Sequence, residues 1–138
     1  EAPKQWRERA ATGRTQGLGA LIDFQVTRWF SDGFRASRPD AVNALKEIFL
    51  ANDIDCYQAT CEMLGDADLR PLAPSIRPPV AIVVGDEDYA TTVDMAKALN
   101  QAIPQSRLTV LAGARHITPV ERPQDIAKQI SDLLGSKA

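Results

Sequence analysis

One short run constrains the fold more than any other feature of the sequence. Residues 79–84 read Pro-Val-Ala-Ile-Val-Val, and Gly85 closes the run. A continuous apolar run of this length, without polar alternation, is typical of a strand buried on both faces of a parallel sheet. A shorter strand is predicted at 107–111, after a helix with Met95, Ala96, Leu99 and Ile103 on one side. This order predicts a parallel pair with a right-handed crossover.

Helices are predicted on both sides of this unit. The preceding residues predict four short helices separated by loops at 12–15, 31–38 and 52–55. The clearest is preceded by Ser37 as a cap and has an apolar face of Ala41, Val42, Leu45, Ile48 and Phe49. Another is predicted from 55 to 64, ending at Gly65. Downstream, Thr91 is predicted to cap the crossover helix, and a final helix over 123–134 is predicted to turn Ile126, Ile130, Leu133 and Leu134 to the core.

Two parallel strands do not make a plausible free-standing sheet, because parallel strands need both faces covered and both edges paired. We therefore interpret the chain as part of a larger α/β protein, with a helical region at 1–70 and an α/β region at 71–138. Further strands would come from another segment. The alternative is that the helical half contains strands that its pattern does not reveal.

Composition excludes several classes of protein. The chain has 138 residues, 44% hydrophobic and 25% charged, with a net charge of -2, so it lacks the basic surface typical of nucleic-acid binding. No apolar run approaches the ~20 residues that span a bilayer. The first residues do not form a signal peptide, and two cysteines are too few for a disulfide framework. These observations predict a cytoplasmic protein that binds neither nucleic acid nor membrane.

Two motifs follow the predicted strands and carry groups for acid–base chemistry. Gly85-Asp86-Glu87-Asp88 follows the first strand, and Gly113-Ala114-Arg115-His116 follows the second. In open parallel sheets, catalytic groups collect at this end of the strands. A carboxylate from the first loop would accept the ring N–H of His116, the only histidine, and leave the other ring nitrogen as a general base.

The order of these motifs, with Gly-x-x-Asp before Gly-Ala-x-His near the end of the chain, resembles the C-terminal part of the α/β-hydrolases. The resemblance implies that Asp88 is the catalytic acid and His116 the catalytic histidine, with no metal or other cofactor. It also implies a nucleophilic serine in a Gly-x-Ser-x-Gly turn, which this sequence lacks. The serine and the oxyanion hole would come from an N-terminal hydrolase segment, and this chain alone would be inactive.

The helical half resembles the cap of 3-oxoadipate enol-lactonases, through Trp6-Arg7-Glu8-Arg9, Thr27-Arg28-Trp29-Phe30-Ser31, and Tyr57 followed by Asp66-Ala67-Asp68-Leu69. This resemblance implies a cap at 1–70 and a place in the β-ketoadipate pathway of aromatic-compound catabolism. The implied reaction converts 3-oxoadipate enol-lactone to 3-oxoadipate. Trp29 would line the substrate pocket, and Arg28 would meet a substrate carboxylate.

Two other interpretations remain open. One is a hydrolase of another small ester or of a C–C bond, with the same triad and a different cap. The other is a non-catalytic interaction module that keeps a hydrolase-like half, which the missing nucleophile favours. A partner segment carrying strands and the serine turn would distinguish the enzyme from the module.

Overall fold

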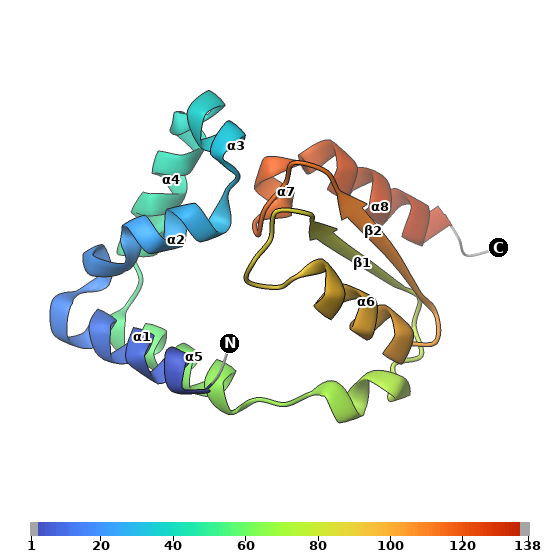
Figure 1. Cartoon of the computed structure of the whole chain (residues 1–138), viewed down its shortest axis with the longest axis horizontal. Helices are drawn as coiled ribbons and strands as arrows, with labels where there is room; N and C mark the ends of the chain where they lie inside the picture. The colour runs from blue at the N-terminus through green and yellow to red at the C-terminus, as the bar shows by residue number, and fades with distance from the viewer. Residues whose placement is uncertain (1–2, 136–138) are drawn as a thin grey trace. The chain divides into compact units, whose positions relative to one another are not determined.

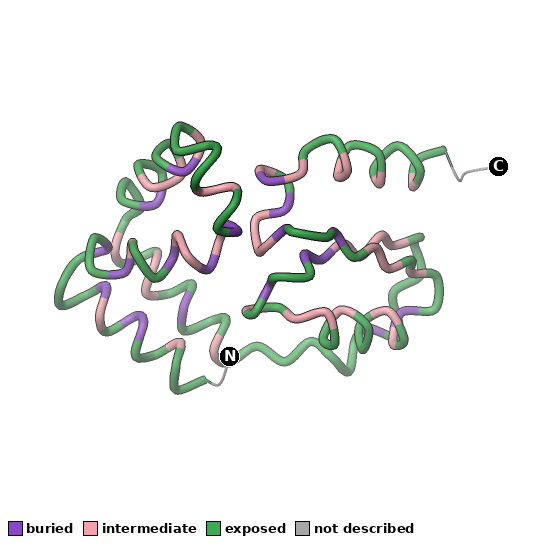
Figure 2. Tube along the Cα trace, turned by 45° about the horizontal axis from the view of Figure 1, so that its top comes forward, coloured by how far each residue is buried: buried purple, intermediate pink, exposed green. Residues whose placement is uncertain are grey.

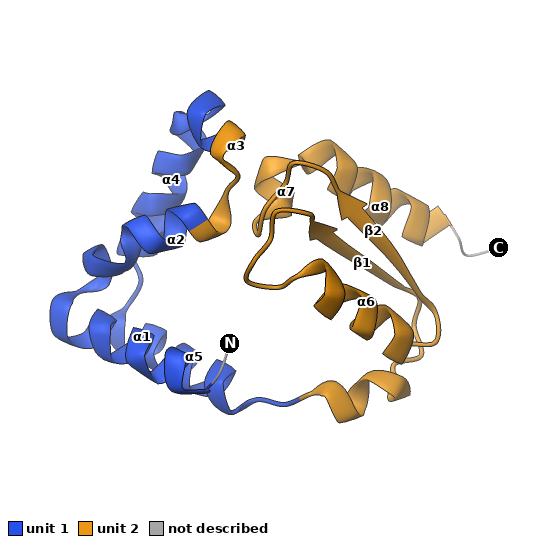
Figure 3. Ribbon diagram, in the orientation of Figure 1, with its two compact units in different colours: residues 1–27, 35–68 blue, residues 28–34, 69–138 orange. Residues whose placement is uncertain are grey.

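The computed structural model describes residues 3–135, and the chain divides into two compact units. Residues 1–27 and 35–68 form the first unit, and residues 28–34 and 69–138 form the second (Figure 3). The second unit therefore contains a short piece of the helical half as well as the α/β region. The cap and core assignments to 1–70 and 71–138 stay predictions.

The first unit is helical. Its elements are α1 (Pro3–Gln16), the 3-10 helix η1 (Leu18–Leu21), most of α2 (Ile22–Trp29), α4 (Pro39–Leu50) and α5 (Ile54–Asp66). Helix α1 packs along α5. Inside this unit the Phe49 and Tyr57 rings meet edge to face with centroids 5.6 Å apart, and the Arg9 guanidinium lies 4.5 Å from the Trp6 ring centroid.

Several helix boundaries differ from the sequence prediction. The predicted loop at 31–38 contains a short helix, α3 (Asp32–Ser37). The residue before α4 is Arg38, not Ser37, and no side chain caps this helix. Helix α5 begins earlier than predicted because the Asp53 side chain accepts a hydrogen bond from the Cys56 amide at 2.9 Å.

The second unit contains the two predicted strands. From residue 69 onward, its elements are η2 (Arg70–Ser75), β1 (Val80–Gly85), α6 (Val93–Ala102), β2 (Ser106–Leu111), α7 (Thr118–Glu121) and α8 (Pro123–Gly135). Strands β1 and β2 pair in parallel, with Val80 opposite Ser106 and Gly85 opposite Leu111. Helices α6 and α8 flank the strands on opposite sides (Figure 1). The predicted strand–helix–strand unit is confirmed.

Much of the predicted apolar core of this unit is exposed (Figure 2). On the apolar side of α6, Met95 and Leu99 are 52% and 43% exposed, and on α8 Ile130 and Leu134 are 54% and 64% exposed. The prediction that Ile130 and Leu134 face the core is therefore wrong for this chain. Two strands and two helices do not supply enough surface to cover these faces.

An apolar groove of about 590 Å³ runs along β1. Its walls include Ile82, Val83 and Val84 of β1, Met95 and Leu99 of α6, and Ala73 of η2. Successive strand side chains point to opposite faces, so a groove lined by three consecutive residues extends around the edge of the strand. The edge of β1 away from β2 is thus open and apolar. No helix within residues 3–135 is both long and apolar enough to cross a membrane.

Gly85 allows the close approach of the two loops that follow the strands. A Cβ at this position would lie 2.6 Å from the Arg115 carbonyl oxygen and closer still to the Ala114 carbonyl. We expect Gly85→Ala to lower the free energy of unfolding by about 1–3 kcal/mol, because backbone atoms must move to make room. Urea unfolding of the variant beside Gly19→Ala, where a Cβ meets nothing within 4 Å, measures this cost. Equal stability of the two variants would contradict it.

Candidate active site

Asp88 lies in the loop between β1 and α6, and its own loop holds its carboxylate. Oδ1 accepts the backbone N–H groups of Ala90 and Thr91 at 2.8 and 2.9 Å. Oδ2 accepts the Thr91 hydroxyl at 2.6 Å. The sequence predicts Thr91 as the cap of α6, but Thr92 occupies that position and accepts from the Met95 amide. The structure therefore assigns Thr91 to orienting the Asp88 carboxylate.

His116 follows β2 and meets that carboxylate. Its Nδ1 atom lies 2.9 Å from Asp88 Oδ2 and 3.3 Å from Thr91 Oγ1. The Thr91 hydroxyl already donates to Asp88, so the proton between carboxylate and imidazole belongs on Nδ1. The Asp88 side chain is 3% exposed and that of His116 is 33% exposed. A neutral His116 thus keeps an unprotonated Nε2 as a proton acceptor.

Burial and hydrogen bonding act on the Asp88 carboxyl in opposite directions. Burial raises its pKa, but the hydrogen bonds from Thr91, His116 and Ala90 outweigh burial and hold the pKa below its ordinary value. The site therefore favours the ionised form of Asp88. A carboxylate beside Nδ1 stabilises the imidazolium that forms when Nε2 takes a proton.

This lowered pKa predicts a dependence of stability on pH. The unfolded chain binds a proton at Asp88 more readily, so the contribution of the ionised group is complete above the unfolded pKa of about 3.9. The contribution is lost as the pH falls through the folded pKa. We expect the stability difference between the wild-type chain and Asp88→Asn to shrink between about pH 7 and about pH 3. Urea unfolding of both at several pH values measures it, and a constant difference would contradict this account.

Three successive backbone amides of the histidine loop are held by two groups. The Arg115 N–H donates to Glu121 Oε2 at 2.8 Å, and the His116 and Ile117 N–H groups both donate to the Trp29 carbonyl at 3.0 Å. Glu121 is 8% exposed, and sequence reasoning did not single it out. Its position five residues after the histidine, at the end of α7, carries no signal without the fold.

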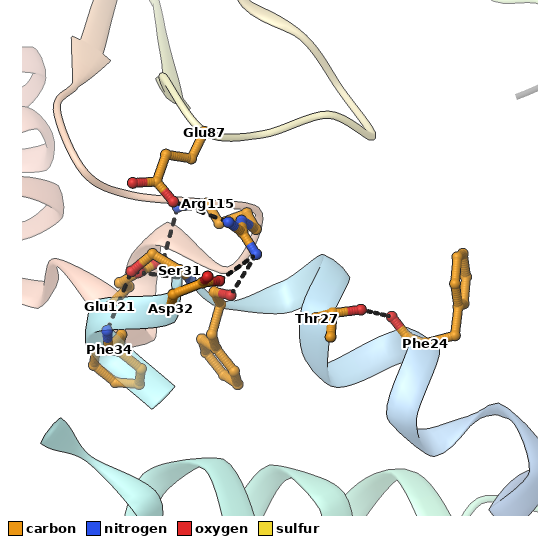
Figure 4. A network of polar contacts seen from close by, with 9 residues as sticks. Phe24, Thr27, Ser31, Asp32, Phe34, Glu87, Arg115 and Glu121 are labelled. Carbon is orange, nitrogen blue, oxygen red and sulfur yellow. Dashed lines mark hydrogen bonds and ion pairs between the residues drawn. The ribbon is translucent and has the colours of Figure 1, made fainter. Parts of the chain in front are cut away.

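The other oxygen of Glu121 binds the end of the α2–α3 junction. Oε1 accepts the Ser31 amide at 3.0 Å and also a short hydrogen bond from the Ser31 hydroxyl (Figure 4). Ser31 is 4% exposed. Hydrogen bonds to a buried carboxylate are stronger than neutral ones, so this junction and the histidine loop hold each other in one arrangement.

The predicted substrate-binding residues lie in the same unit as the Asp88–His116 pair. Trp29 is partly buried, and its carbonyl binds the backbone of the histidine loop. Arg28, directly before it, is buried at 7% exposure in the last turn of α2. Their roles toward a substrate stay predictions. Across residues 3–135, no three His, Cys, Asp or Glu side chains gather as a metal site would require.

No protein-family profile matches the chain. It is 38% identical over 119 residues to 3-oxoadipate enol-lactonase 2 of Acinetobacter baylyi, covering 86% of this chain and 44% of that protein. It is 33% identical over 101 residues to a pimeloyl-acyl-carrier-protein methyl ester esterase of Yersinia pseudotuberculosis, covering 71% and 39%. The structure matches an enol-lactonase from Burkholderia xenovorans with a TM-score of 0.94 and 34% identity, covering 99% of this chain and 52% of that one.

The parallel strands, the two loops and these matches identify the chain as the C-terminal portion of an α/β-hydrolase fold. Its homologues include 3-oxoadipate enol-lactonases, which confirms the resemblance seen in the sequence. The chain spans about half the length of the enol-lactonases it matches.

Proposed function

We propose that this chain supplies the acid and the histidine of a hydrolase that opens 3-oxoadipate enol-lactone to 3-oxoadipate. The observation that carries the proposal is the 2.9 Å contact between Asp88 and His116 Nδ1, at the ends of two neighbouring parallel strands. The 38% identity to an enol-lactonase supports the substrate class. A metal plays no part in this proposal.

The reaction proceeds through a serine that lies outside this chain. Nε2 of His116 takes the hydroxyl proton as the serine oxygen bonds to the lactone carbonyl carbon, and Asp88 stabilises the imidazolium. The ring C–O bond then breaks, and His116 gives the proton to the departing enol oxygen. Water next attacks the acyl-serine while His116 takes its proton. Release of the acid returns that proton to the serine, and the enol tautomerises to the ketone.

The groove along β1 is where the segment that carries the serine docks. The groove is apolar, it extends to the open edge of β1, and a strand added there would have its backbone groups paired. The enol-lactonases that this chain matches are about twice its length, which leaves ample chain for further strands. We propose that this N-terminal hydrolase segment also supplies the oxyanion hole.

Turnover of the assembled protein tests the proposed function. The chain is combined with the N-terminal segment that carries the Gly-x-Ser-x-Gly turn, and release of 3-oxoadipate from the enol-lactone is followed. We expect turnover by the assembly and none by the chain alone. An assembly that forms but does not open the lactone would refute the substrate, and full turnover by the chain alone would refute the outside serine.

Hydrolysis of a small ester is the second candidate, because the chain also resembles a methyl ester esterase at 33% identity. The same acid and histidine serve either substrate, so the site itself does not separate them. The ratio of kcat/KM for the enol-lactone to that for a methyl ester of similar size does. We expect the lactone to be preferred, and a preference for the ester would favour the second candidate.

Arg28 is proposed to bind the carboxylate of the substrate. It is a buried cation, and the next residue, Trp29, contacts the histidine loop through its carbonyl. A charge-assisted hydrogen bond to a bound carboxylate is worth about 1.5–3 kcal/mol. We therefore expect Arg28→Met to raise KM for the lactone by about 10- to 100-fold while kcat changes little. An unchanged KM would remove Arg28 from the site.

A further inference from the structure

Two side-chain links join the acid loop, which follows β1 and carries Asp88, to the histidine loop, which follows β2 and carries His116. In each loop the two linked residues are neighbours in the sequence. Asp88 meets His116, and Glu87 Oε2 accepts from Arg115 Nη2 at 3.0 Å. Each pair is 28 residues apart in the sequence. The Glu87 amide also donates to the Ala114 carbonyl at 3.0 Å. The residue directly before the acid is therefore tied to the residue directly before the histidine.

The Arg115 guanidinium also binds the α2–α3 junction. Nη1 donates to the Phe30 carbonyl at 3.1 Å. It also donates to Asp32 Oδ1 at 3.3 Å (Figure 4). The centre of the guanidinium lies 5.7 Å from the Tyr89 ring centroid, within cation–π range. The Arg115 guanidinium thus bonds both to the acid loop and to the α2–α3 junction, and each of these segments also contacts the histidine loop.

This arrangement is unlike an ordinary surface ion pair. The Arg115 side chain is 14% exposed and its partners Glu87 and Asp32 are 42% and 80% exposed, whereas both partners of the Arg38–Asp40 pair are more than half exposed. Solvent therefore screens the contacts to Glu87 and to the Phe30 carbonyl less than those of a surface pair, and the contact to Asp32 adds little. The guanidinium fork reaches Glu87 and Phe30 with different nitrogens, which the single ammonium of a lysine does not reproduce.

We propose that Arg115 is a positioning residue, which fixes His116 against Asp88 by clamping the acid loop and the α2–α3 junction to the histidine loop. The inference rests on the proposed function for its effect on turnover, but the clamp itself is a property of this chain. Asp88 contacts the imidazole directly. Arg115 acts only through the loops, so its loss alters how well the imidazole is held rather than removing a reacting group.

The test uses Arg115→Met, which keeps the length of the side chain and removes the guanidinium. His116 is the only histidine, so the ring-nitrogen NMR spectrum of the full chain reports its tautomer without overlap. We expect the spectrum to move from Nδ1–H toward a mixture of tautomers. In the assembled protein we expect kcat to fall about ten-fold with KM within about two-fold. Arg115→Lys should lie between the variant and the wild type, and Arg38→Met serves as the control.

The outcomes separate the clamp from a merely structural role. If Arg115→Met lowers the melting temperature but leaves the histidine spectrum and kcat per active site unchanged, the proposal is overturned. If Arg115→Met does not fold, the same two readouts are taken on Glu87→Gln, which weakens one link and keeps the arginine. An unchanged histidine spectrum and an unchanged kcat in Glu87→Gln then overturn the proposal. If Arg115→Met changes the histidine spectrum but His116→Ala leaves turnover by the assembled protein unchanged, the clamp is supported and the proposed function is refuted.

Discussion

His116→Ala is expected to lower kcat of the assembled protein by about 10⁴- to 10⁶-fold, with KM changed only a few-fold. The imidazole is the proposed proton acceptor for both the serine and the attacking water, so its loss affects both halves of the reaction. The His116 side chain is 33% exposed and is not one of the fully buried core residues. The fold should therefore survive the change.

Steady-state kinetics normalised to titrated active sites measure this effect. Gln101→Ala, at an exposed position on α6, is the matched control and should keep the wild-type kcat. If His116→Ala retains more than about a tenth of wild-type kcat, the histidine is not the general base. The proposed mechanism would then be wrong, whatever substrate is hydrolysed.

Asp88→Asn is expected to lower kcat by about 10⁴-fold without a comparable change in KM. The carbonyl of the introduced amide would accept the two backbone hydrogen bonds that Oδ1 accepts in the wild type, which leaves the amide NH₂ group in the place of Oδ2, facing Nδ1 of His116. A donor at that place favours the tautomer with the proton on Nε2, and this tautomer does not accept the serine proton. The loss of kcat therefore comes from the wrong histidine tautomer and not from a change in the shape of the site.

Two comparisons sharpen the Asp88 result. Asp94→Asn removes a carboxylate from the same helix–loop region, but its side chain is 90% exposed and pairs only with Lys97 among the contacts described. This control should keep wild-type activity. The double variant Asp88→Asn/His116→Ala should be no slower than His116→Ala alone, because the acid acts through the histidine. Additive losses would show that Asp88 has a separate role.

The strands and the two chemical motifs could be predicted from the sequence because local pattern determines them. The run at 79–84 is apolar without polar alternation, which predicts a strand although most of it is only half-buried in this chain, and each motif directly follows a strand. Parallel pairing then brings the two strand ends together, which is how residues 28 apart meet. Periodicity and strand order predicted that a carboxylate of this loop meets His116, and the resemblance to the α/β-hydrolases selected Asp88 rather than Asp86.

The supporting contacts could not be predicted in this way because they join segments far apart in the sequence. Ser31 and Glu121 are 90 residues apart, and nothing in the local sequence of either indicates the other. The hydroxyl of Thr91 has the same preference for a helix cap as for a carboxylate neighbour, so pattern alone assigns it to the cap. Periodicity predicts burial of the apolar faces on α6 and α8 because it records which side is apolar and not what covers it.

The tautomer of His116 in the wild-type chain, read from its ring-nitrogen NMR spectrum at about pH 9, tests the central relation between acid and base. For the neutral imidazole, a carboxylate acceptor beside Nδ1 predicts a single form with the proton on Nδ1 and an unprotonated Nε2. A proton found on Nε2 would contradict the account, since the nitrogen meant to receive the serine proton would already carry one.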